Sequence, residues 1–202
     1  MSSVTLSRAS GLALLLGAVL FIVGNILSFA GAPLTPLWLV MTGVWISGMV
    51  LLLLGLPGIV ARQAARAGWL GFVGFLLTFL GWFLLTSFYM GDDLIISSWL
   101  DALAPHVYVQ WFVNPAVAVS LHVANSLLGG GGVLLGMATM RARVFPRWAG
   151  LLLIAAVVAL GSFVIGNLTS VAAGLVALGL GWMGYTLLRA QGEAVPQPVP
   201  AS

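Results

Sequence analysis

The chain has 202 residues, of which 61% are hydrophobic and only 5% are charged. A soluble domain carries about 25% charged residues, so this composition excludes an ordinary water-soluble fold and indicates that lipid surrounds most of the chain. Cysteine is absent and all seven basic residues are arginines, which excludes disulfides, thiolate metal sites, a cysteine nucleophile and a Schiff-base lysine. No basic patch typical of nucleic-acid binding is present, so no nucleic-acid partner is predicted.

Six apolar segments follow one another along the chain, each close to the roughly 20 residues that a helix needs to cross a bilayer. They cover residues 11–29, 37–56, 69–89, 116–140, 149–166 and 171–188. We therefore predict an all-α integral membrane protein with six transmembrane helices in a single domain, residues 1–189. Residues 190–202 are Pro-rich and polar, which is typical of a disordered tail.

The arginines all fall on one side of these segments. If the N-terminus lies inside, the positive-inside rule is satisfied by every one of them, namely Arg8, Arg62, Arg66, Arg141, Arg143, Arg147 and Arg189. The sequence thus predicts a multi-pass protein of the cell (plasma) membrane, a bacterial inner membrane, with both termini in the cytoplasm.

An internal repeat suggests how the segments are arranged. Residues 21–28 (FIVGNILS) match residues 163–170 (FVIGNLTS), and the two helices also begin alike, with Arg-x-x-Gly at 8–11 and 147–150. These matches predict three helical hairpins of the same orientation, unlike the inverted repeats common in transporters. The run VFPRWAG at residues 144–150 resembles a segment of several uncharacterised bacterial six-span proteins, and that resemblance implies no particular activity.

The loop at residues 91–114 is predicted to be external. Within it, Ile95, Ile96, Trp99 and Leu103 recur at helical spacing, with Ser97, Ser98 and Asp101 on another face. This pattern predicts a short amphipathic helix that lies along the outer surface, over the mouth of the bundle. Asn followed by Pro at 114–115 is a typical start for the helix that comes next.

The best candidates for a site are His122 and Asn125. His122 is the only ionisable side chain inside any predicted span, and such a residue is by default a functional hypothesis. Read at helical spacing, Ala118, His122, Asn125, Gly129, Gly132 and Gly136 form a small and polar stripe that should face other helices. With Asn25 and Asn167, which close two other spans, the pair predicts an outward-facing polar cavity. The alternative is that a neutral His122 only forms a hydrogen bond between helices.

Asp92 and Asp93 are a second candidate, at the start of the external helix. Paired carboxylates could hold a cation or a substrate amine at the outer mouth. The alternative reading is that they cap the surface helix and complement its dipole. No metal site is predicted from these residues, and the sequence leaves any cofactor unknown.

Four consecutive glycines at residues 129–132 fit either a hinge in a broken helix or a tight crossing of two helices. Small-residue faces of this kind also predict a homo- or hetero-oligomer.

Because no carboxylate lies within a span and no catalytic motif is present, we expect a protein that binds or permeates a small or lipid-like molecule, and the enzyme class stays uncertain. A subunit of a larger membrane complex and an outer-leaflet lipid enzyme are the alternatives.

Overall fold

The computed structural model describes residues 3–28, 35–161 and 168–189, and all regular structure in these ranges is helical. The prediction of an all-α chain is therefore confirmed. In chain order the helices are α1 (Ser3–Ser28), α2 (Pro36–Gly91), the π-helical turn η1 (Asp92–Ile96), α3 (Ser97–Leu103), α4 (Pro105–Phe112), α5 (Pro115–Ala142), α6 (Arg147–Gly161) and α7 (Leu168–Arg189).

Four helical stretches in the described residues are long and apolar enough to cross a membrane. They are Thr5–Leu27, Pro36–Leu103, Pro115–Ala142 and Val171–Arg189. The second stretch contains the predicted spans 37–56 and 69–89. Helix α6 is apolar but shorter, and the end of the predicted span 149–166 lies outside the described residues, as does the predicted tail.

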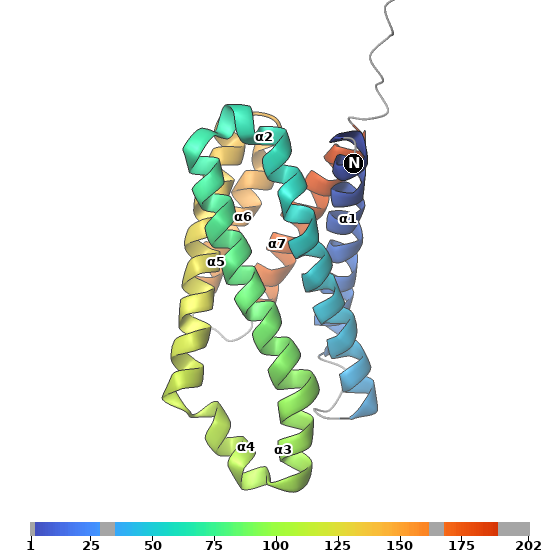
Figure 1. Cartoon of the computed structure of the whole chain (residues 1–202), viewed down its shortest axis with the longest axis vertical. Helices are drawn as coiled ribbons and strands as arrows, with labels where there is room; N and C mark the ends of the chain where they lie inside the picture. The colour runs from blue at the N-terminus through green and yellow to red at the C-terminus, as the bar shows by residue number, and fades with distance from the viewer. Residues whose placement is uncertain (1–2, 29–34, 162–167, 190–202) are drawn as a thin grey trace, which may run out of the picture.

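Helix α2 consists of two antiparallel arms that meet at Gly68 (Figure 1). Gly68 has φ 59° and ψ −152°, a backbone conformation that is essentially restricted to glycine. The sequence predicted a connection between residues 56 and 69, but the first arm stays helical through the exposed Pro57 up to this glycine. The polar residues of this stretch suggested a loop, but Arg62 and Arg66 are exposed side chains on the last turns of the helical arm.

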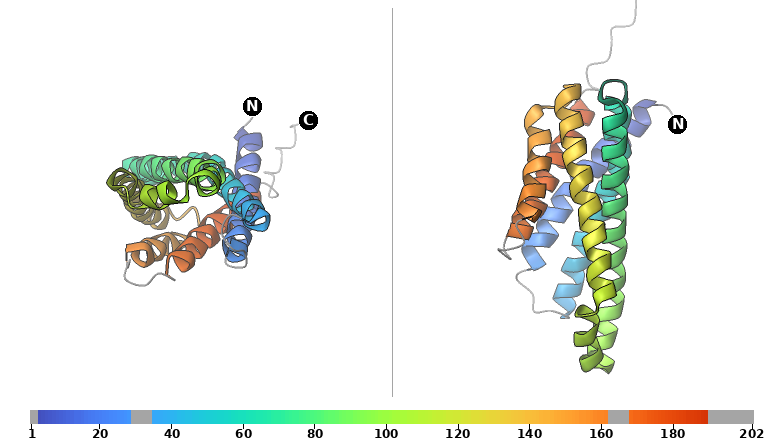
Figure 2. Two further views of the ribbon diagram at one scale, coloured as in Figure 1. Left: turned by 90° about the horizontal axis from the view of Figure 1, so that it is seen from below. Right: turned by 90° about the vertical axis from the view of Figure 1, so that its left-hand side faces the viewer.

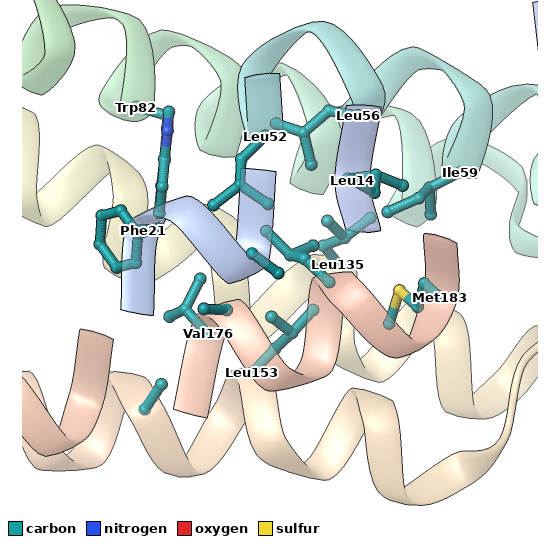
Figure 3. Close-up of a cluster of buried hydrophobic side chains, with 14 of the residues drawn as sticks. Leu14, Phe21, Leu52, Leu56, Ile59, Trp82, Leu135, Leu153, Val176 and Met183 are labelled. Carbon is teal, nitrogen blue, oxygen red and sulfur yellow. The ribbon is translucent and has the colours of Figure 1, made fainter. Parts of the chain in front are cut away.

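The helices pack as neighbours around a common core (Figure 2). Helix α1 contacts the first arm of α2 and also α7, whereas the second arm of α2 contacts α5. Helix α6 lies between α5 and α7. Five helices supply the buried side chains in Figure 3, for example Leu14, Leu52, Leu135, Leu153 and Met183.

Glycines allow these helices to approach closely. A methyl group at Gly48 would collide with the backbone of Phe21 in α1, and one at Gly131 would collide with the backbone of Thr78 in α2. Such contacts suit an environment in which van der Waals packing, rather than the hydrophobic effect, holds helices together. Helix α5 runs without a break through residues 129–132, so the structure favours the tight crossing over the hinge.

The loop predicted as an external lid is also helical, but its arrangement differs from the prediction. Helices η1 and α3 continue α2, and α4 then returns to α5 (Figure 1). Among the described residues, these short helices contact α2, α5 and one another, but not α1, α6 or α7. They form a cap (residues 92–112) on the α2–α5 pair, which extends further than the other helices (Figure 2), and so do not cover the mouth of the whole bundle.

Candidate functional site

Helix α5 begins with the N-terminal capping residue that the sequence predicted, Asn114. The Asn114 side chain accepts a hydrogen bond of 2.9 Å from the backbone N–H of Ala116, and Pro115 occupies the first turn. This side chain satisfies one of the N–H groups that the first turn of a helix leaves without a partner. Asn114 thereby fixes where the helix starts and which residues fall within its first turns.

The predicted small and polar stripe of α5 is covered over only part of its length. Gly136 lies against Gly150, and Gly132 and Gly129 lie against Val157 of α6. In this antiparallel register, the level of His122 lies beyond Gly161, the last described residue of α6. Ala118 and His122, at the N-terminal end of the stripe, are exposed, so the described part of the chain does not cover the stripe there as the sequence predicted.

The His122 ring is oriented by its own helix. Its Nδ1 atom lies 2.7 Å from the carbonyl oxygen of Ala118, one turn earlier. Because a carbonyl can only accept, Nδ1 must carry the proton, and the lone pair of the neutral ring is then on Nε2. This contact fixes the orientation of the imidazole ring on α5.

An open groove of about 580 Å³ runs along this face of α5. The groove is largely apolar, with His122 and Ser126 as its polar side chains among the described residues that line it. The other lining residues are Pro115, Ala118, Val119, Val123 and Leu127. An elongated apolar surface with one or two polar groups suits the chain and head of an amphiphile better than a compact polar substrate.

Of the three predicted asparagines, the structure describes Asn125 and Asn25, and neither lines this groove. The Asn125 side chain donates a hydrogen bond of 2.8 Å to the carbonyl oxygen of Leu121 and does not line the groove. Asn25 lies near the C-terminal end of α1, which does not contact α5. Asn167 lies outside the described residues. The structure thus places His122 beside the groove, whereas Asn125 and Asn25, the two predicted asparagines that it describes, are not among the residues that line it.

Asp92 lies in the π-helical turn that follows α2 and is buried, with 3% of its surface exposed. Its Oδ1 atom accepts a hydrogen bond of 2.6 Å from the indole Nε1 of Trp111 in α4. The turn has no side-chain cap, so the interpretation of Asp92 and Asp93 as helix caps is wrong. Because α2 continues into η1 without a break, there is no helix N-terminus for them to cap.

Asp93 is only partly buried. Desolvation, with a further contribution from the neighbouring Asp92 charge, raises the pKa of the Asp93 carboxyl from 3.8 to about 6. Within the described ranges, no group of three or more His, Cys, Asp or Glu side chains could hold a metal ion. Helix η1 also has no contact with α5, so the structure does not bring these carboxylates to His122.

Three polar residues in this arrangement were not singled out from the sequence. Ser126 lines the groove, and Trp111 is the donor to Asp92. Gln63 is 1% exposed, and its Oε1 atom accepts a hydrogen bond of 3.2 Å from Thr139 of α5. The spacing of Gln63, four residues after Ile59 and four before Ala67, indicates that it lies on the same buried side of the helix as these two residues. The neighbouring Arg62 made this stretch look like an exposed loop.

Comparison with known proteins adds no functional information. No family model, no curated protein and no solved structure matches the chain. The function therefore has to be argued from the chemistry of the grooves and side chains described above.

Proposed function

We propose that the protein is a six-span inner-membrane protein built from three helical hairpins of one orientation, with both termini in the cytoplasm. The start of α1, the turn at Gly68, the connection from α5 to α6 and the end of α7 lie at one end of the bundle (Figure 1). All seven arginines belong to these parts of the chain. An end that collects the positive charge is the cytoplasmic end under the positive-inside rule.

The proposed orientation also predicts how deep His122 lies in the membrane. Helix α5 has 28 residues, or about 42 Å at 1.5 Å per residue, which exceeds the roughly 30 Å of the hydrocarbon layer. Counting about 20 residues outward from Arg141, at the inner boundary, reaches Leu121. His122 then lies at the level of the outer headgroups, and the cap lies outside the hydrocarbon layer.

The function that follows is the binding of a lipid-like molecule from the outer leaflet. The observation that carries it is the groove along α5, with His122 and Ser126 beside an apolar surface. The chain of the ligand would pack on Val123 and Leu127, on the cytoplasmic side of His122, while its polar head would lie at the level of His122. Binding rather than chemistry is proposed because the carboxylates of the cap do not meet the histidine.

The test is photo-crosslinking in nanodiscs with a phosphatidylethanolamine that carries a diazirine in its acyl chain. We expect labelled peptides from residues 115–127 and a severalfold loss of label in His122→Ala. Ser120→Ala is the matched control, because Ser120 is an exposed polar residue of the same helix that does not line this groove. Equal labelling of the two variants and the parent protein would refute the proposal.

A second candidate, a subunit of a larger membrane complex, is favoured by the surface of the cap. Trp99 and Leu103 are 63% and 67% exposed, and Val113, just after the cap, is 73% exposed. Large apolar side chains on an external surface are typical of a contact with a partner protein. Extraction in a mild detergent should then yield an assembly that Trp99→Ser disrupts, whereas a monodisperse monomer would contradict it.

A further inference from the structure

A second apolar groove lies on another side of the bundle, between α1 and α7. It has a volume of about 390 Å³ and is lined mainly by aliphatic and aromatic side chains. Ala18, Ala177 and Gly181 meet in it, and their small size leaves space between the larger side chains on either side. The groove therefore results from the small residues at the contact between α1 and α7.

The residues on its α1 wall follow one helical stripe, Leu15, Val19 and Ile22. Residues seven apart lie on nearly the same side of an α-helix. Arg8 precedes Leu15 by seven residues and is exposed. The stripe that lines the groove thus ends, toward the cytoplasmic end, in a guanidinium group.

The α7 wall ends in the same way. Trp182 and Tyr185 line the groove, and Arg189 follows them by seven and four residues. The guanidinium carbon of Arg189 lies 5.5 Å from the centroid of the Tyr185 ring. This cation–π contact holds the charge beside the groove wall.

The two arginines belong to the same end of the groove because α1 and α7 pack antiparallel. A methyl group at Gly11 would contact both the carbonyl oxygen of Gly184 and the side chain of Leu188. Arg8 lies about one turn before Gly11, and Arg189 directly follows Leu188. In the described residues the carboxylates are all in the cap, at the opposite end (Figure 1), so none of them neutralises this pair.

We propose that this groove binds an anionic phospholipid of the cytoplasmic leaflet. The phosphate lies between Arg8 and Arg189, whose planar guanidinium groups match phosphate oxygens, and one acyl chain lies in the groove between α1 and α7. This inference rests on the membrane orientation proposed above but concerns a different leaflet, different helices and a different headgroup charge from the site at His122.

The test is native mass spectrometry of the full chain in a neutral detergent, titrated with phosphatidylglycerol or phosphatidylcholine. We expect phosphatidylglycerol adducts to exceed phosphatidylcholine adducts and to fall about tenfold in the double variant Arg8→Gln, Arg189→Gln. The matched control is Arg62→Gln with Arg66→Gln, which removes the same charge from the same end and should retain binding. Glycerol phosphate, the headgroup without chains, should not compete.

A second pair of variants tests the groove itself. Val19 and Leu16 are both 53% exposed, but only Val19 lines the groove. Val19→Trp should fill it and lower phosphatidylglycerol binding, whereas Leu16→Trp should not. Unchanged selectivity in the Arg8, Arg189 double variant, or an equal loss in the Arg62, Arg66 control, overturns the proposal.

The same titration separates this inference from the proposed function. His122→Ala should leave phosphatidylglycerol binding at the arginines unchanged, even where it abolishes outer-leaflet labelling. Release of the protein from membranes by alkaline carbonate would instead show that the chain does not span the membrane, and would overturn both proposals.

Discussion

Two adjacent glycines of α5 should respond in opposite directions to the same substitution. Gly130 is exposed, and a methyl group added there would meet no atom within 4 Å, whereas one added at Gly131 would collide with the backbone of Thr78. Gly130→Ala should stabilise by about 0.5–1 kcal/mol, because alanine loses less conformational entropy in a helix. Gly131→Ala gains the same entropic stabilisation, but its methyl group must push α5 away from α2. Such overpacking typically costs about 1–3 kcal/mol.

The free energy of unfolding can be compared by titrating each variant in mixed micelles with SDS and following tryptophan fluorescence. Gly131→Ala should unfold at the lowest SDS fraction, the parent protein at a higher one and Gly130→Ala at the highest. Because the two sites share a helix and nearly the same depth, effects of lipid or detergent on alanine cancel in the comparison. Two shifts of the same sign and similar size would refute the close α2–α5 crossing.

Three other perturbations test separate features of the fold. Gly68→Ala should cost about 1–3 kcal/mol in the same SDS titration, because φ 59° with ψ −152° is strained for any residue with a Cβ; a neutral result would contradict the turn. Trp111→Phe should cost about 1.5–3 kcal/mol, since it leaves the buried Asp92 without its indole donor, and the loss should shrink in an Asp92→Asn background. Asp93 is protonated more readily in the folded state, with its pKa raised from 3.8 to about 6, so its contribution to stability is lost as pH rises through that window. Asp93→Asn should therefore gain in melting temperature over the parent between about pH 4 and pH 6 and keep a constant advantage above it, and parallel pH profiles would be the contrary result.

The site was only partly predictable, and the particular residues show why. His122 was singled out as the one ionisable group in an apolar segment, which needs no knowledge of neighbouring helices. Whether its stripe is covered depends on where α6 lies against α5, and that is set by the contact of Gly136 with Gly150. Asn125 shares the predicted stripe but donates to its own helix, a choice that spacing does not reveal.

The roles of the two aspartates were also beyond the sequence. Burial of Asp92 depends on Trp111, which is 19 residues away and belongs to a different helix. The interpretation as caps assumed that a new helix begins at Asp92, but the π-helical turn continues α2 through that point. Neither the continuation of α2 nor the contact with Trp111 can be derived from the spacing of the two carboxylates along the chain.

The sequence by itself determined that the chain is helical, that its helices are apolar enough to cross a membrane and that its arginines cluster between them. These properties follow from side-chain hydrophobicity and the 1.5 Å rise of a helix, both of which are local. The tertiary structure alone decided which glycines touch, which parts of α5 remain open and which side chains line the groove between α1 and α7. Those features depend on the register of one helix against another, because a shift of one residue turns a helical face by about 100°.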